Sequence, residues 1–136
     1  MEIRPYREAD GASVVALWRR CDLVVAWNDP LQDIDRKLQV QRQLFLVAEH
    51  QGQIVGTVMA GYDGHRGWIN YLATAPDHQR KGIGRALMSV AEDGLRALGC
   101  PKVNLQVRRW NSNAVGFYEH IGYAVEDNVS MGKRLR

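Results

Sequence analysis

The stretch His78–Leu87, HQRKGIGRAL, decides the fold, because here a strand-like run gives way to helical periodicity. It places Arg80, Lys81 and Arg85 around two glycines. Such a stretch is either a solvent-exposed basic loop or a cradle for phosphate groups. The first N–H groups of a helix have no partner within it, and the helix dipole adds about half a positive charge there. Glycines let a ligand approach that backbone, so a phosphate-bearing ligand of unspecified identity is indicated.

Two common phosphate-binding motifs do not fit this stretch. A GxGxxG dinucleotide motif requires a glycine where the chain has Leu87. A P-loop requires GxxxxGK followed by Ser or Thr, and the chain contains no such run. The glycine pair alone therefore does not choose between loop and cradle, and the flanking segments have to decide.

Composition indicates one ordinary globular domain. The chain has 136 residues, of which 46% are hydrophobic and 24% charged, and no linker or repeat divides it, so we predict a single domain over 1–136. A net charge of +3 is too small to indicate a nucleic-acid partner. No signal peptide and no apolar run of about 20 residues is present, so we expect a cytoplasmic protein without a membrane partner. Two cysteines and four histidines lack metal-ligand spacing, so we expect no metal.

Hydrophobic periodicity predicts an α/β (α+β) fold. In chain order we expect strand 2–6, a helix capped by Asp10, a helix starting at Asp29-Pro30, a hairpin of strands 44–50 and 53–63, strand 68–75, a helix from Ile83 to Leu98, strand 102–107, a helix over 114–121, and two strands after Gly122. The helix from Ile83 has one apolar face, formed by Ile83, Ala86, Leu87, Val90, Ala91, Leu95 and Leu98. This order predicts a mixed, mostly antiparallel sheet of six to seven strands with about four helices on both faces. Strands 68–75 and 102–107 should be a parallel, splayed pair.

The segments around the glycine pair resemble the motifs of one family. QRKGIG, at Gln79–Gly84, resembles the Q/R-x-x-G-x-G/A signature of the GCN5-related N-acetyltransferases (GNAT). YLATAPDHQRKG resembles their preceding strand and loop, and NSNAVGFYEHIGY, at Asn111–Tyr123, resembles their second motif. The motifs follow the family's order over residues 44–123. WNDP and GYDGHRG further resemble segments of the small bacterial YpeA-type members.

The resemblance implies an acetyl-CoA-dependent N-acetyltransferase, in which a primary amine attacks the thioester directly in a ternary complex. In the family, the strand before the glycine loop is bulged and splayed, pairs with the pantetheine arm, and supplies an N–H to the thioester carbonyl. The loop binds the pyrophosphate, mainly through backbone amides. The implied cofactor contacts here are Leu72, Ala73, Thr74, Gln79, Arg80, Lys81, Gly82, Ile83, Gly84, Arg85, Asn111, Ala114 and Tyr118.

Tyr118 is the implied general acid, which would protonate the leaving thiolate. A phenol with a pKa of about 10 is protonated at neutral pH and is a competent proton donor. The same tyrosine also fits as an ordinary aromatic residue of an amphipathic helix. The general base stays unassigned, because histone-type relatives have a glutamate where this chain has Trp68. Weak candidates for the base are Glu49, Asp63, His65 and Asp29.

The acceptor is not determined by these patterns. It is a small-molecule amine, a protein N-terminus or a lysine, and segments 23–32 and 126–130 are expected to select it. A catalytically weak or inactive acyl-CoA-binding module is the alternative function. The sequence also leaves open whether the chain forms a homodimer and whether it accepts longer acyl-CoAs.

Overall fold

A five-stranded sheet in the order β1-β2-β3-β4-β5 lies in the first of two compact units, Met1–Gln106. The strands are β1 Glu2–Pro5, β2 Phe45–His50, β3 Gln53–Tyr62, β4 Gly67–Thr74 and β5 Val103–Leu105. Neighbours pair antiparallel except β4 and β5, which are parallel, as predicted. The computed structural model describes residues 1–136, and its second unit is Val107–Arg136. The single domain over 1–136 stays a prediction.

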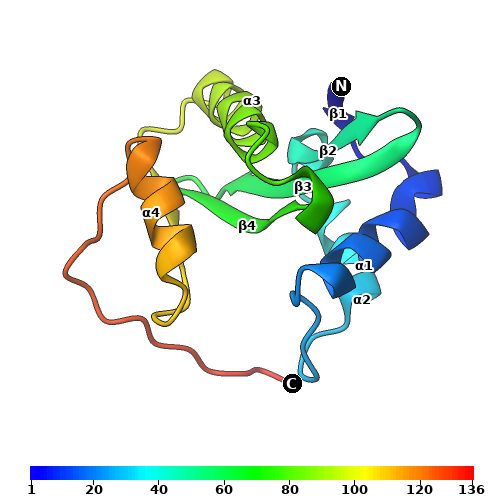
Figure 1. Ribbon diagram of the computed structural model, residues 1–136. Helices are drawn as coiled ribbons and strands as arrows, with labels where there is room; N and C mark the ends of the chain where they lie inside the picture. Colours follow the sequence, from blue (N-terminus) through cyan, green and yellow to red (C-terminus); the bar gives the residue numbers. More distant parts are fainter. The chain divides into compact units, whose positions relative to one another are not determined.

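Helices cover both faces of this sheet, as predicted. Figure 1 shows α3, Ile83–Ala97, over one face, and α1, Gly11–Arg20, with α2, Pro30–Lys37, over the other. Two neighbouring residues of β3 show that the sheet contacts helices on both faces. Thr57 is hydrogen-bonded to the indole of Trp18 in α1, whereas a Cβ on Gly56 would lie 2.8 Å from Leu87 in α3. Successive side chains of a strand point to opposite faces, so the sheet is buried on both sides.

The core fills the two layers between sheet and helices. Its largest fully buried side chains are Trp18, Phe45, Leu17, Leu87, Met88 and Leu95. Burying a side chain of this size contributes roughly 1.5–3 kcal/mol. On α3 the buried residues are Ile83, Leu87, Met88, Ala91 and Leu95. Val90 and Leu98 are each 40% exposed, so their predicted place on the buried face is wrong: the buried stripe follows every fourth residue from Ile83, with Met88 beside it.

Local turn and cap signals are largely confirmed. Asp29 caps α2, since its Oδ1 accepts hydrogen bonds from the amides of Leu31 and Gln32. The β2–β3 turn has positive φ at Gln51 and Gly52, the pair expected to form it. Three short 3-10 helices complete the unit, η1 Glu8–Asp10, η2 Arg42–Leu44 and η3 Pro76–His78.

Asp10 precedes α1 as predicted but does not cap it. Its carboxylate instead binds the guanidinium of Arg4 at 2.8 and 3.0 Å and accepts from the amide of Arg7 at 2.8 Å. Hydrogen bonding to Arg4 lowers the pKa of Asp10 below its usual value. An ion pair between buried partners takes precedence here over a local cap, because an unpaired buried guanidinium would be strongly destabilising.

The second unit has one helix, α4 Ser112–His120, and no strand. The two strands predicted after Gly122 are therefore wrong, and the sheet has five strands and not six to seven. The alternation of Val125, Val129 and Met131 with polar residues is typical of a half-buried strand. All three side chains are 77–90% exposed, so no apolar surface holds the segment in an extended pairing.

Candidate active site

Strand β4 carries a bulge at Tyr71. Thr57 pairs with Ala73 and Met59 with Asn70, so a step of two along β3 corresponds to a step of three along β4. The extra residue is accommodated by a φ of +53° at Tyr71, a left-handed conformation that an aromatic residue rarely adopts. The bulge implied by the family resemblance is therefore present, at the residue before Leu72.

Beyond the bulge, β4 has an unpaired outer edge. β5 pairs only with Gly67, Trp68 and Ile69, whereas β4 continues to Thr74. The amide of Ala75 donates to Val55 across β3, so alternation along the strand turns the amides of Thr74 and Leu72 away from β3. An unpaired strand edge accepts an extended ligand as an additional strand. The expected contacts Leu72–Thr74 lie on this edge.

The loop after β4 enters α3 through two left-handed residues, Arg80 with φ +66° and Gly82 with φ +78°. The first backbone bond of the helix runs from Ala86 to Gly82, so the amides of residues 83–85 have no helical partner. They lie at the positive end of the helix dipole. A Cβ at Gly82 would meet no protein atom within 4 Å, so the space over this backbone is open. The arrangement is suited to an anion.

Cations surround this opening. The side chains of Arg80, Lys81 and Arg85 are exposed. The start of the loop is tied to α1, since Arg20 donates to Asp77 at 2.9 Å. The hydrogen bond from Arg20 lowers the pKa of Asp77, so this carboxylate stays charged and paired. The basic residues that remain around the glycines are thus available to a phosphate.

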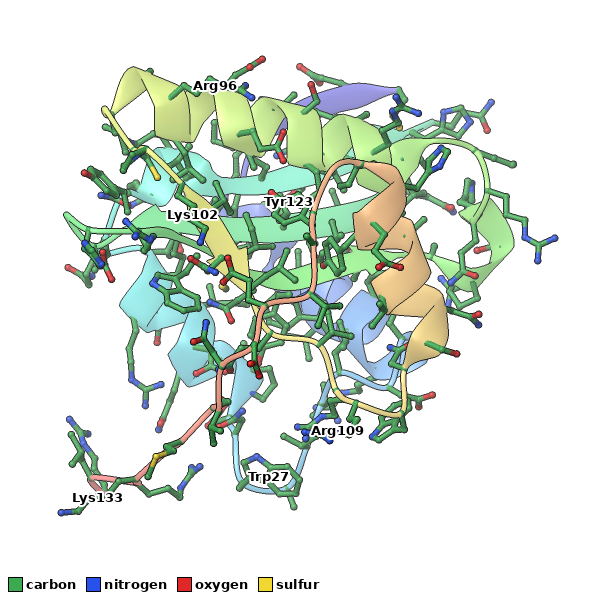
Figure 2. All side chains as sticks on the ribbon, turned by 90° about the vertical axis from the view of Figure 1, so that its left-hand side faces the viewer. Trp27, Arg96, Lys102, Arg109, Tyr123 and Lys133 are labelled. Carbon is green, nitrogen blue, oxygen red and sulfur yellow. The ribbon has the colours of Figure 1, made fainter.

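In the second unit, α4 carries the remaining candidates. Asn111 is the N-cap of α4, and its Oδ1 accepts from the amide of Ala114 at 3.1 Å, which leaves its side-chain N–H groups to donate to a ligand. Tyr118 is half-buried beside Phe117 and Tyr123, with ring centroids 5.2 and 5.7 Å away. Tyr123, which follows α4, is labelled in Figure 2. Burial raises the pKa of Tyr118 to about 12, which keeps its phenol protonated at neutral pH.

Two of the four candidate bases have structural roles. Glu49 lies in β2 and binds Arg4 at 3.3 Å, with about a third of its side chain exposed. Asp29 caps α2, as described above. Both carboxylates are therefore already engaged by other groups of the protein.

The other two candidates lie in the β3–β4 turn. Asp63 accepts hydrogen bonds from the amides of His65 and Arg66, both at 2.8 Å, and from the indole of Trp68 at 3.2 Å. The backbone hydrogen bonds lower the pKa of Asp63. His65 is exposed in the same turn. The structure therefore identifies no base among the four.

A network that was not predicted from sequence surrounds the bulge. The hydroxyl of Tyr71 donates to Oδ2 of Asp33 at 2.6 Å, and the ring stacks on Trp18 with centroids 3.8 Å apart. Thr57 donates from Oγ1 to the carbonyl of Tyr71 at 2.9 Å and accepts from the indole of Trp18 at 2.9 Å. The one sequence signal was the pair Tyr71-Leu72, two large side chains in succession that interrupt the alternation of the strand. Nothing in the sequence indicates Asp33.

No group of three or more His, Cys, Asp or Glu side chains is placed to hold a metal ion. None of the helices is both long and apolar enough to span a membrane.

Comparison with known proteins agrees with this geometry. Residues 12–123 match the model of the Acetyltransferase (GNAT) family. An acetyltransferase of Pectobacterium atrosepticum is 52% identical over 135 residues, which cover 99% of this chain and 96% of the relative. The aminoglycoside 6'-N-acetyltransferase of Acinetobacter haemolyticus has a similar fold, with a TM-score of 0.79, 18% identity and full coverage of both chains (100% each). The PaiA N-acetyltransferase of Thermoplasma acidophilum, solved with coenzyme A, has a TM-score of 0.79 at 22% identity over 94% of this chain and 92% of its own.

Proposed function

The chain belongs to the GNAT family of acetyltransferases, and on that premise we propose that it transfers an acetyl group from acetyl-CoA to a primary amine by direct attack in a ternary complex. One observation carries the proposal: the unpaired edge of β4 leads through an open loop directly to the unpaired amides of α3. An extended arm ending in a pyrophosphate requires this succession of a strand-like edge and an anion site. The WNDP and GYDGHRG segments support a place among the YpeA-type members.

Each part of the cofactor is assigned to a part of this path. The pantetheine arm would pair with Leu72–Thr74, and the pyrophosphate with the backbone of residues 79–85, assisted by the three cations. Asn111 and Ala114 would contribute further contacts. The coenzyme A complex of the Thermoplasma acidophilum protein, which has a similar fold, supports coenzyme A as the ligand.

Catalysis would come mainly from positioning and carbonyl polarisation. An outward N–H of β4 would stabilise the oxyanion that forms when the amine attacks. When the C–S bond breaks, Tyr118 would give its phenolic proton to sulfur and recover a proton from the new C–N nitrogen. With a pKa of about 12, Tyr118 holds its proton far more tightly than a thiol of ordinary pKa about 8.5, so donation to sulfur depends on that recovery.

The acceptor is proposed as a small-molecule amine, a protein N-terminus or a lysine. Within the first unit, the α1–α2 segment would contribute to its selection, because it places Trp27, 56% exposed, at the tip of its loop (Figure 2). The segment also carries Asp29, whose carboxylate caps the N-terminus of α2. Exposed aromatic surface beside acidic residues suits an amine on an amphipathic molecule.

A screen for acetylation tests this function. Release of coenzyme A from acetyl-CoA is measured with aminoglycosides, polyamines, peptides with free N-termini and lysine peptides, against hydrolysis without amine. Turnover with one class of amine, reduced in Tyr118→Phe, supports the transferase.

A second candidate function is an acyl-CoA-binding module without turnover. It is favoured because Trp68 stands where histone-type relatives have a glutamate, and because Glu49 and Asp29 are already engaged within the protein. That candidate predicts ligand-induced thermal stabilisation and no acetylated amine.

A further inference from the structure

The strained residue of the sheet is Tyr71, and its surroundings hold it on three sides. A non-glycine residue at φ +53° is unfavourable and persists only where neighbouring groups determine it. Trp18 stacks on the ring, Asp33 accepts from the hydroxyl, and Thr57 donates to the carbonyl. Strain kept in this way indicates a conformation that the protein uses, in this case next to the proposed thioester site.

Thr57 controls the direction of one particular amide. The carbonyl of Tyr71 and the amide of Leu72 belong to one peptide group, which is planar and trans, so they point in opposite directions. Because the hydroxyl of Thr57 binds the carbonyl from the β3 side, it turns the amide of Leu72 toward the unpaired edge.

Thr57 is itself fixed in one orientation. It is fully buried, and its hydroxyl has a single proton to donate and lone pairs that can accept. The indole of Trp18 donates to Oγ1, so the hydroxyl proton is directed to Tyr71. A buried threonine in a strand could serve packing alone, but valine would do so equally well without a polar atom to satisfy.

We propose that Thr57 is a positioning residue for acetyl transfer. Through the carbonyl of Tyr71 it aims the amide of Leu72 at the oxygen of the thioester, where the negative charge of the transition state develops. The inference rests on the proposed function, since it needs acetyl-CoA bound along β4. Thr57 lies in β3 and would not touch the substrate, but it would control how strongly the thioester carbonyl is polarised.

The test measures the bound carbonyl as well as turnover. Wild type is compared with Thr57→Val, which keeps the shape and loses the hydroxyl, and with Thr57→Ser, which restores the hydroxyl. Thr57→Val also leaves the buried indole N–H of Trp18 without an acceptor, which could itself disturb the site. The double variant Trp18→Phe/Thr57→Val is therefore compared with Trp18→Phe alone. Neither of these two proteins contains the indole N–H, so they differ only in the hydroxyl-bearing residue. Infrared difference spectra with [1-13C]acetyl-CoA report the C=O stretch, and steady-state kinetics report kcat and KM.

Removal of the hydroxyl should misalign the donor without removing the binding edge. We expect kcat to fall roughly ten- to a hundredfold, which is somewhat less than the 10²–10³-fold loss that follows complete removal of an oxyanion donor. The KM for acetyl-CoA should change by less than about threefold. The C=O stretch should move toward its value in free acetyl-CoA in both valine variants. Thr57→Ser should restore frequency and rate.

Other outcomes separate the inference from the function on which it rests. Wild-type frequency and kcat in both valine variants would overturn the role of Thr57 and leave the transferase intact. If wild type shifts the carbonyl but acetylates no amine, the transferase function fails, while loss of that shift in Thr57→Val still supports the positioning role. If wild type does not bind acetyl-CoA, both proposals are overturned.

Discussion

The hydroxyl of Tyr71 lies 2.6 Å from Oδ2 of Asp33 and joins the bulge of β4 to helix α2. Burial and this hydrogen bond raise the pKa of Tyr71 above its ordinary value, so the phenol is a donor across the physiological range. The bond connects the strand edge that would hold the cofactor to the helix that follows the loop proposed to select the acceptor. Residues 38 apart in the chain are thereby brought to one place.

Tyr71→Phe removes this bond and keeps the ring that stacks on Trp18. We expect the free energy of unfolding to fall by about 1 kcal/mol, the usual contribution of one hydrogen bond. Thermal or urea denaturation checks this, with Tyr62→Phe as control, because the Tyr62 hydroxyl also donates a hydrogen bond, to the carbonyl of Gly64, at an exposed site. Equal losses of unfolding free energy in the two variants would mean that the bond to Asp33 stabilises the fold no more than an exposed hydrogen bond does.

Gly82→Val should abolish stabilisation by acetyl-CoA, because a branched side chain would occupy the open space over the helix amides. Gly52→Val is a matched control: both glycines have φ +78° and neither would bring a Cβ within 4 Å of other atoms. Both variants should lose roughly 1–2 kcal/mol to backbone strain. Only Gly82→Val should lose the ligand-induced shift in Tm. An unchanged shift in that variant would exclude the phosphate cradle.

Tyr118→Phe should reduce kcat roughly 10²-fold or more and leave the KM for acetyl-CoA nearly unchanged. Since the pKa of Tyr118 is raised to about 12, its acid form persists to high pH, and wild-type kcat should show no loss near pH 10 from this group. The pH profile of both proteins measures this. A wild-type limb near pH 10 that disappears in Tyr118→Phe would contradict the raised pKa.

Lys37 should make stability depend on pH. Burial lowers its pKa from 10.5 to about 8, and its ammonium donates to the carbonyls of Ala60 and Val40. Between these two values the unfolded chain binds more protons than the folded protein, so the free energy of unfolding contributed by Lys37 rises with pH. Tm of wild type should therefore rise relative to Lys37→Met between about pH 8 and 10. A difference that stays constant over this range would show that Lys37 keeps an ordinary pKa.

Cys21 should not form an acetyl-enzyme. Its thiol lies against the carbonyl of Thr74 at 3.4 Å, next to the proposed cofactor edge, but burial raises the pKa of Cys21 and keeps it a thiol. Intact-protein mass spectrometry after incubation with acetyl-CoA alone should show no added acetyl group at this residue. A stoichiometric acetyl-Cys21 that is transferred to an added amine would replace direct attack by a two-step route.

The glycine loop was predictable because its information is local. Gly82 ends a loop and begins α3, and Asp29-Pro30 begins α2, at the expected positions. In both places the backbone conformation depends on residues within one turn. The order of elements from β1 to α4 followed from the same local signals. Strands after Gly122 could not be predicted reliably in this way. Apolar residues alternate with polar ones in 123–136, but such a pattern forms a strand only where a neighbouring surface buries its apolar side, and these apolar side chains are exposed.

By itself the sequence determined the family, the order of the elements through α4, and the place of the glycine loop before α3, since motif residues and helix starts act within a few positions. Tertiary structure alone decided how the proposed site is held. It turned Asp10 from a cap into the partner of Arg4, and it placed Tyr71 at positive φ under contacts from α1, α2 and β3. The reason is physical: the local preference of Tyr71 disfavours that conformation, and only the hydrogen bonds and stacking supplied by distant residues offset its cost.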